Sequence, residues 1–165
     1  MKTIPLTQGL VAIVDDEDYP ELSKYKWCAA RFHNRGTYYA LRSDRSTGKN
    51  LQVCMHRQIL GLEHGDPRQG DHVNRNGLDN RRENLRIATN AENGRNRPVQ
   101  ANNTTGLKGV GWNKQHRKYH AQIKVDGKKI HLGLFASPIA AARAYDAAAR
   151  KYFGEFARPN FQEAT

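Results

Sequence analysis

The chain has little cysteine. Its two cysteines, Cys28 and Cys54, are far apart in the sequence of 165 residues and form no Cys-x-x-Cys pair. Disulfide-rich folds and zinc ribbons need several cysteines at short spacings, so the sequence argues against both classes. We therefore predict two buried, free thiols in a protein of a reducing compartment.

Long apolar runs are also missing. The longest are short stretches such as Leu10–Val14, whereas a membrane-spanning helix needs about 20 apolar residues. Met1 and Lys2 lead into a predicted strand and not into the apolar segment of a signal peptide. We expect a cytoplasmic protein that has no membrane segment.

Acidic residues are fewer than basic residues. The chain has 16 Asp and Glu against 27 Lys and Arg, which gives a formal charge of +11 and a pI near 9.9. Residues 105–165 hold eleven Lys and Arg but four Asp and Glu, a charge of +7. A polyanionic partner is indicated, and the last third of the chain is predicted to be its main anchor.

A polar stretch over residues 71–93 organises the rest of the chain. It begins with Asp71-His72, continues through an Asn- and Gly-rich turn, and reaches a short apolar strand at Leu85–Ala88. Thr89 and Glu92 match a Ser/Thr-x-x-Glu capping box, which predicts a helix that starts at Thr89. The expected order is strand, loop, strand, helix.

The residues Asp71-His72, Asn84 and Asn93 resemble, in order, the HNH motif of homing and phage endonucleases, which have a ββα-metal fold. The resemblance implies that His72 activates water and that Asn84, a buried hydrogen-bonding residue, holds the loop and aims His72. It implies that Asp71 and Asn93 bind the metal, and it suggests a bacterial or phage-infected cell as the setting.

These residue types suit the chemistry. Phosphodiester hydrolysis needs an activated water and a cation near the leaving oxygen, and histidine titrates near neutral pH. Asp71 and Asn93 offer oxygens, which favour Mg²⁺ or Mn²⁺ over Zn²⁺. A regular strand would point Asp71 and His72 to opposite faces, but the short, bent hairpin of the family lets both address one metal site.

The region before the motif predicts a small sheet that packs on the nuclease core. We expect a helix over Tyr19–Tyr25 and, for the Asp15–Asp18 cluster, either a place at that helix N-terminus or a metal site. His56 opens a short predicted helix and either contacts DNA or makes a structural hydrogen bond. The predicted strands are Thr3–Leu6, Leu10–Val14, Lys26–Phe32, Thr37–Arg42 and Leu51–His56, with His33–Gly36 joining two of them.

Polar residues around Pro98 predict a linker after the nuclease helix. Arg95 and Arg97 either follow a phosphate backbone or are simply solvated. Beyond the linker, the Asp126-Gly127 pair predicts a hairpin turn within a three-stranded sheet. Ser137 and Pro138 then predict the start of a helix that ends at Gly154.

Residues 106–161 resemble the plant ethylene-response-factor (APETALA-type) DNA-binding domain in strand order, in the LGLF and AARAYD segments and in the closing Asn-Phe. The resemblance implies a sheet that lies in the major groove of duplex DNA. Lysine replaces several arginines of the plant domains and lacks their rigid fork, so mainly phosphate contacts are expected. The matching positions are Lys108, Trp112, Lys114, Lys118, His120, Gln122 and Lys124.

Together these features predict an α+β protein that is a site-directed, metal-dependent DNA endonuclease, either a monomer or a weak dimer. One alternative is a DNA-binding regulatory or architectural protein with a decayed nuclease site, and another is a non-specific nuclease toxin. The predicted parts are a β-rich region at residues 1–56, an HNH core at 57–97, a linker at 98–105 and a DNA-binding domain at 106–161.

Overall fold

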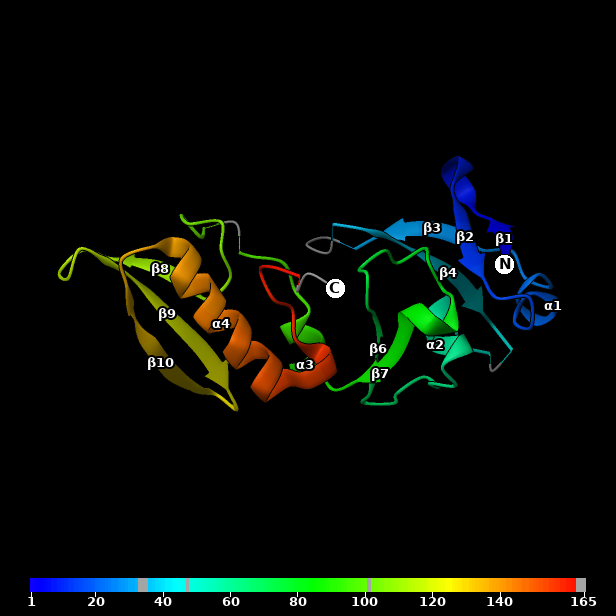
Figure 1. Ribbon diagram of the computed structural model, residues 1–165. Coiled ribbons are helices and arrows are strands. Elements are labelled where there is room, and N and C mark those ends of the chain that lie inside the picture. The colour runs from blue at the N-terminus through cyan, green and yellow to red at the C-terminus, as the bar shows by residue number, and fades with distance from the viewer. Residues whose placement is uncertain (33–35, 47, 101, 163–165) are drawn as a thin grey trace. The chain divides into compact units, whose positions relative to one another are not determined.

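The computed structural model describes residues 1–32, 36–46, 48–100 and 102–162. It is a mixed α/β chain with several small antiparallel sheets and few helices, in agreement with the predicted α+β class (Figure 1). The chain divides into two compact units, Met1–Asn93 and Gly94–Thr165. The predicted connection at His33–Arg35 lies outside the described residues.

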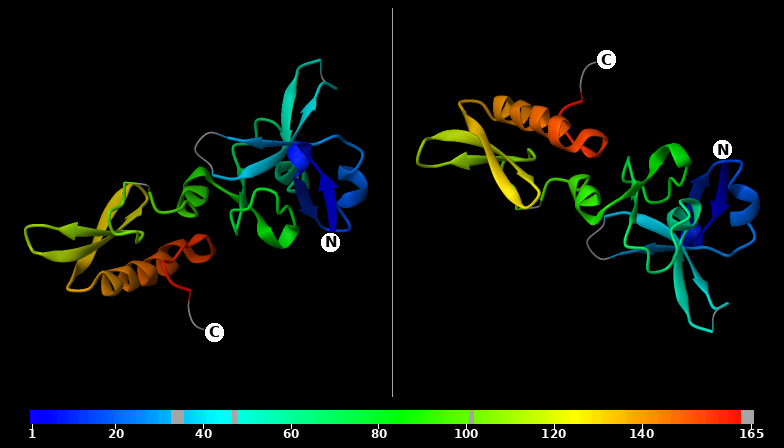
Figure 2. Two further views of the ribbon diagram at one scale, coloured as in Figure 1. Left: turned by 90° about the horizontal axis from the view of Figure 1, so that it is seen from above. Right: turned by 90° about the horizontal axis from the view of Figure 1, so that it is seen from below.

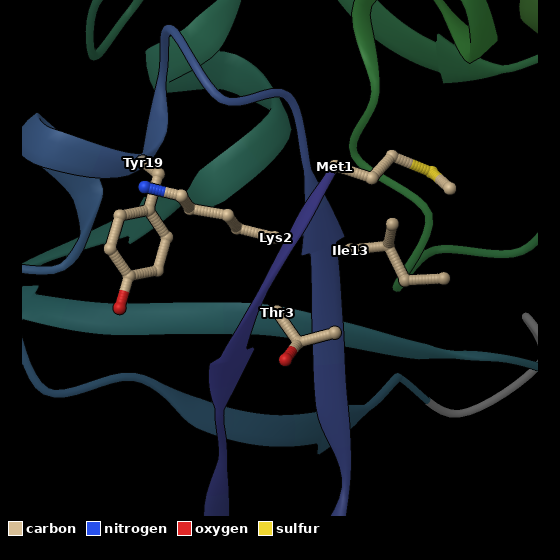
Figure 3. Close-up of a pocket in the computed structure, with 5 residues that line it drawn as sticks. All are labelled: Met1, Lys2, Thr3, Ile13 and Tyr19. Carbon is tan, nitrogen blue, oxygen red and sulfur yellow. The ribbon is translucent and has the colours of Figure 1, made fainter.

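The first unit opens with a hairpin of β1 (Lys2–Pro5) and β2 (Val11–Val14), joined through a turn in which Gln8 and Gly9 have positive φ angles. A short helix, α1 (Tyr19–Leu22), follows and ends before the predicted Tyr25. Figure 3 shows Lys2 beside Tyr19 at a shallow hollow, where the ammonium lies 4.7 Å from the ring centroid.

The second sheet of this unit has β4 (Tyr38–Asp44) between β3 (Cys28–Arg31) and β5 (Leu51–Cys54). The chain turns into α2 (Met55–Ile59) directly after β5, so the strand predicted to reach His56 is two residues shorter than expected. The core beneath these elements contains the fully buried Met55 and is made of Ile4, Ala12, Val14, Leu22, Trp27, Ala40, Met55, Ile59 and Leu85.

The prediction that both thiols are buried is wrong. Cys28 is exposed and Cys54 is half-buried, and both are free cysteines. Each is paired with Leu41 across the sheet, and Leu41 is the buried member of that row. A free Cys is often a small core residue, but here the apolar leucine is the residue that fills the core.

The polar stretch forms a third sheet and a helix. β6 (Gln69–His72) pairs with β7 (Leu85–Ala88), a 3-10 turn (Arg82–Asn84) precedes β7, and α3 (Asn90–Arg95) follows it. The predicted capping box is confirmed, because the Thr89 amide donates to Glu92 Oε2 at 2.8 Å and the Glu92 amide donates to Thr89 Oγ1 at 3.2 Å. This cap fixes the start of the helix that carries Asn93.

The second unit has the three strands and the helix expected from the sequence. β9 (Lys118–Val125) lies between β8 (Val110–Asn113) and β10 (Lys128–Phe135) in an antiparallel sheet. Figures 1 and 2 show α4 (Pro138–Phe153) packed along this sheet. Ser137 Oγ caps the helix by accepting from the Ile139 amide at 3.2 Å, and Gly154 ends it with a φ of 52°.

Small side chains let α4 lie close to the sheet. Ala141, Ala142 and Ala149 have no exposed surface, and they face Val110, Ala121 and Ile123 of the strands. The chain after α4 is held by Asp146, whose carboxylate accepts from the Asn160 amide at 2.7 Å and the Phe161 amide at 2.9 Å. Within the described residues, no helix has the length and apolarity that crossing a membrane requires.

Candidate active site

The register of the β6–β7 pair determines where the candidate residues point. Asp71 is opposite Arg86, and His72 is opposite Leu85. Because successive side chains of a strand alternate between faces, Asp71 and His72 lie on opposite faces of this hairpin. Gln69 lies on the face of Asp71 and Gly70 on the face of His72.

His72 occupies a buried pocket of aromatic and amide groups, with 4% of its surface exposed. Its Nε2 lies 3.1 Å from Asn80 Oδ1, and its ring centroid lies 4.9 Å from that of His56 and 5.7 Å from that of Tyr39. Burial lowers the pKa of His72 below its ordinary value, although the Asn80 contact opposes that shift. The imidazole is therefore neutral at pH 7, which is the form that a general base requires.

Gly70 makes this pocket possible. A Cβ at Gly70 would lie 2.5 Å from His56 Cδ2, closer than real contacts allow. The His56 ring occupies the place that a side chain on β6 would otherwise fill. His56 is buried in the pocket, at the start of α2, so the structure places it beside His72.

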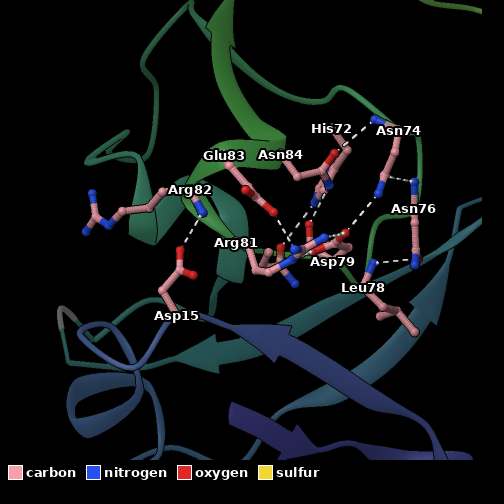
Figure 4. Close-up of polar contacts among 11 residues, drawn as sticks. Asp15, His72, Asn74, Asn76, Leu78, Asp79, Arg81, Arg82, Glu83 and Asn84 are labelled. Atoms are coloured by element: carbon pink, nitrogen blue, oxygen red, sulfur yellow. Dashed lines mark hydrogen bonds and ion pairs between the residues drawn. The ribbon is translucent and has the colours of Figure 1, made fainter. Parts of the chain in front are cut away.

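The loop between β6 and β7 is built on side-chain amides and one buried carboxylate (Figure 4). Asp79 forms a two-pronged ion pair with Arg81, both contacts at 2.8 Å, and accepts from Asn74 Nδ2 at 2.8 Å. The Arg81 guanidinium holds the pKa of Asp79 below its ordinary value. Asp79 is thus an ionised centre around which the loop is organised.

Asn84 holds the backbone of the same loop. Its Oδ1 accepts from the Asn74 amide at 2.9 Å, and its Nδ2 donates to the Asp79 carbonyl at 2.7 Å. Asn74 and Asn76 in turn accept from amides two residues later, at 2.8 and 3.1 Å. Asparagine is frequent here because its short side chain can satisfy the backbone of a tight loop.

The acidic cluster near the N-terminus has a partner distant in sequence. Asp15 Oδ2 accepts from the Arg82 amide at 2.8 Å, and the Arg82 guanidinium contacts Asp18 at 2.6 Å and Glu17 at 2.7 Å. Asp18 is the residue before α1, but its side chain makes no capping hydrogen bond. Through Arg82 the cluster is attached to the site loop. Among the described residues, no group of three or more His, Cys, Asp or Glu side chains could hold a metal.

The two predicted metal ligands lie on one face of β6. Asp71 is buried, and its Oδ2 accepts from Arg86 Nε at 2.9 Å and from Nη2 at 2.7 Å. Asn93 Nδ2 donates to Gln69 Oε1 at 2.6 Å, and Gln69 shares the face of Asp71. The hairpin therefore gathers Asp71 and Asn93 on one side, together with Arg86, and His72 on the other.

The residues predicted to bind DNA separate into groups. Pairing along β8 and β9 puts Lys118, His120, Gln122 and Lys124 on the outer face of the sheet. The Trp112 ring lies on the face toward α4, 4.8 Å from the Tyr119 ring, and is 45% exposed at the sheet edge. The sheet therefore does not present Trp112 together with the lysines.

The remaining predicted DNA contacts lie outside the strands. Lys108 donates its ammonium to the carbonyls of Arg95 and Arg97, the latter at 3.0 Å. The Arg95 guanidinium lies 4.5 Å from the centroid of the Phe153 ring. Arg97 and Lys114 are exposed. The contacts of Lys108 and Phe153 thus hold the segment Gly94–Arg97 within the second unit.

Sequence reasoning did not single out several residues that the structure brings to these surfaces. Asn80 and Arg86 contact His72 and Asp71, but a lone Asn or Arg gives no signal before the strand register is known. Lys129 and His131 of β10 pair with Lys124 and Gln122 on the outer face of the sheet. Alternation along the strand predicted from Lys129 to Phe135 could have found those two.

Comparison with known proteins identifies the family. No protein-family model matches the chain. It is 31% identical over 158 residues to an uncharacterized HNH endonuclease of Acanthamoeba polyphaga mimivirus, which covers 93% of this chain and 76% of that protein. It is 32% identical over 77 residues to Protein 3.8 of Escherichia phage T7, covering 45% of this chain and 64% of that protein. Neither name supports the ethylene-response-factor resemblance, which stays a prediction. The chain belongs to the HNH endonuclease family.

Proposed function

We propose that this protein is a site-directed, metal-dependent endonuclease that hydrolyses phosphodiester bonds in duplex DNA. The observation that carries the proposal is the buried, neutral His72 on the strand next to Asp71, in a chain of the HNH endonuclease family. The succession of β6, β7 and α3 supports a ββα-metal core. Asp71 and His72 lie on opposite faces of β6, and His72 is the last residue of that strand. We therefore propose that the phosphate binds at the end of β6, where both side chains reach it and His72 takes the proton of the attacking water.

Asp71 and Asn93 are the proposed ligands of a divalent cation. Their oxygens are the donors that Mg²⁺ and Mn²⁺ prefer, and Mg²⁺ is often held by one or two protein groups together with water and phosphate. The Gln69 contact uses the amide nitrogen of Asn93, which leaves its oxygen as the atom to offer a cation. When bound, the cation would stabilise negative charge on the phosphate and on the leaving oxygen.

Arg86 adds a fixed positive charge at this face. It contacts Asp71 through two nitrogens, so a cation on Asp71 would share the carboxylate with the guanidinium. A guanidinium beside a phosphate-binding site can also hydrogen-bond phosphate oxygens. We propose that Arg86 orients Asp71 and helps to bind the scissile phosphate.

The outer face of the second unit is the proposed DNA-binding surface. It combines Lys118, Lys124 and Lys129 with His120 and His131, and the described residues of this face include no Asp or Glu. Lysines on a sheet contribute phosphate contacts and little base discrimination. Arg97 and Lys114 are further exposed cations, whereas the ammonium of Lys108 is already bound to carbonyls.

A second candidate function is DNA binding without cleavage. The ion pair between Asp71 and Arg86 favours it, because that pair would also stabilise a scaffold that binds no metal. Such a protein would have a decayed nuclease site and act in regulation or DNA architecture. It would retain affinity for duplex DNA and leave the duplex uncut.

Mapping of DNA ends tests these functions. The purified protein is incubated with duplex genomic DNA and Mg²⁺ or Mn²⁺, and the new ends are sequenced beside a His72→Ala control. A site-directed enzyme gives reproducible ends at one sequence that the control lacks. Scattered ends would indicate a non-specific nuclease toxin, and binding without new ends would indicate the decayed protein.

A further inference from the structure

Asn80 has an unusual environment for a polar residue in a loop. It has no exposed surface and is among the largest fully buried side chains of the described residues. Its backbone is fixed by the first hairpin, because the Asn80 amide donates to the Ile13 carbonyl and the Ile13 amide donates to the Leu78 carbonyl, both at 2.8 Å. These two bonds attach the loop to β2 at the bridge between Ile13 and Asp79.

One end of the Asn80 side chain meets the candidate base. Its Oδ1 lies 3.1 Å from His72 Nε2. An amide oxygen only accepts hydrogen bonds, so this contact is a hydrogen bond in the form of His72 that carries its hydrogen on Nε2. A neutral imidazole with its hydrogen on Nε2 has its lone pair on Nδ1.

The other end of the side chain is unsatisfied. Asn80 Nδ2 is buried and has no hydrogen-bond partner in the part of the chain that the structure describes. A buried unpaired amide destabilises a fold, and an apolar side chain of the same branching, such as leucine, would avoid that cost. The amide is therefore explained better by what its oxygen does for His72 than by its contribution to packing.

We propose that Asn80 is the positioning residue of the active site, which fixes the Nε2–H form of His72 and directs Nδ1 to the attacking water. This inference rests on the proposed nuclease function. In the step concerned, an O–H bond of water breaks and its proton goes to Nδ1, while the water oxygen bonds to phosphorus. The bond from phosphorus to the leaving oxygen breaks, and solvent protonates that oxygen.

The assignment separates the roles of two asparagines. Asn84 bonds the Asn74 amide and the Asp79 carbonyl and so shapes the loop, whereas Asn80 contacts the imidazole itself. The first hairpin then also contributes to the site, because Ile13 of β2 determines where the Asn80 backbone lies. The N-terminal strands then act on the reaction through a chain of three residues, Ile13, Asn80 and His72.

Nitrogen-15 NMR of the full chain labelled in histidine tests the assignment without any cleavage assay. The His72 signals are identified by their loss in His72→Ala, and the wild type is expected to show hydrogen on Nε2. In Asn80→Leu, which removes the acceptor and keeps the number of side-chain heavy atoms, the two neutral forms are expected to mix. A wild type with hydrogen on Nδ1 would overturn the proposal, whether or not the protein cuts DNA.

Kinetics supply the second test. Asn80→Leu is expected to lower kcat by about ten- to hundred-fold, with KM unchanged, by analogy with the loss on removing a hydrogen-bond partner that orients a metal ligand. Asn80→Asp keeps an acceptor oxygen and is expected to recover most of that loss, while circular dichroism checks that both variants fold. An unchanged kcat in folded Asn80→Leu contradicts the assignment. A wild type that cuts nothing contradicts the nuclease proposal instead, and the NMR result still decides on Asn80.

Discussion

The two compact units bury different kinds of side chain. Of the described residues, the first unit buries six polar or charged groups, namely His56, Asp71, His72, Asp79, Asn80 and Asn84, and the second buries Asn96 and Asp146. Burying a polar group destabilises a protein unless the group is hydrogen-bonded. The first unit therefore keeps polar side chains in its interior although their burial lowers its stability, which is expected of a catalytic site. The second unit is built mainly on the packing of alanine and aliphatic side chains.

The units also use their positive charges differently. Residues 1–93 carry fourteen Lys and Arg against twelve Asp and Glu, while residues 94–165 carry thirteen against four. In the first unit Arg81, Arg82 and Arg86 are bound to carboxylates. Within the described residues, no ion pair involves Lys118, Lys124 or Lys129 of the second unit. The three arginines of the first unit are thus used to stabilise the site loop. The three lysines of the second unit remain available to bind a polyanion.

The largest expected effect comes from removing the base. His72→Ala should reduce the rate of cleavage by about a hundred- to ten-thousand-fold, because a general base contributes that much to the chemical step. Single-turnover nicking of supercoiled plasmid measures the rate. His64→Ala changes an exposed histidine of the same unit and serves as the control. Equal rates for both variants would remove His72 from its role.

The next effect concerns stability. It tests whether the buried polar side chains of the first unit stabilise the loop that carries them. Asp79→Ala removes the partner of Arg81 and Asn74. Because Asp79 is buried but Arg81 is partly exposed, the loss should be about 2 kcal/mol of unfolding free energy, the size expected for hydrogen bonds to a charged group. Urea denaturation measures the change. Glu83→Ala removes a more exposed partner of the same Arg81 and should cost less than about 1 kcal/mol. A similar cost for both would show that Asp79 does not organise the loop.

A smaller effect is expected on the metal requirement. EDTA should stop cleavage, and Mg²⁺ or Mn²⁺ should restore it, since the proposed ligands are oxygens. Asp71→Ala and Asn93→Ala should raise the Mg²⁺ concentration for half-maximal rate by at least about tenfold, the loss that even an outer-shell partner can cause. Asp66→Ala, on the loop before β6, is the control. Full activity in excess EDTA would exclude the proposed site.

The smallest effect tests the second unit. Lys124→Ala or Lys129→Ala should each flatten the dependence of log affinity on log salt by about 0.9, because each loses one phosphate contact. Lys151→Ala changes an exposed lysine of α4 and should leave the slope intact. Fluorescence anisotropy on one duplex at several salt concentrations gives the slopes. Equal slopes for all three variants would show that the DNA does not bind to the outer face of this sheet.

Local signals predicted much of this fold. The Thr89–Glu92 box, the Asp126-Gly127 turn, the Ser137 cap and the Gly154 stop each depend on residues a few positions apart, and the structure contains all four features. The spacing of Asp71-His72, Asn84 and Asn93 was sufficient to suggest the family. These features lie in the sequence itself because turns and caps are local interactions.

Partners distant in sequence could not be predicted in this way. Arg82 binds Asp15, Glu17 and Asp18, and nothing near the acidic cluster indicates an arginine more than sixty residues later. The face on which Trp112 lies follows only from its pairing with Tyr119. The contact between Asn80 and His72 depends on where β2 holds the loop. Each of these is set by tertiary structure and not by local pattern.

The comparison of the two units leads to one decisive measurement, in which rate and affinity are determined on the same preparations. His72→Ala and the double variant Lys124→Ala/Lys129→Ala are each assayed for DNA affinity in EDTA and for single-turnover rate with Mg²⁺ at saturating protein. If cleavage and anchoring belong to separate units, His72→Ala keeps its affinity and loses its rate, while the lysine variant loses affinity and keeps its rate. If the two variants instead lose rate and affinity together, cleavage and anchoring do not belong to separate units of this protein.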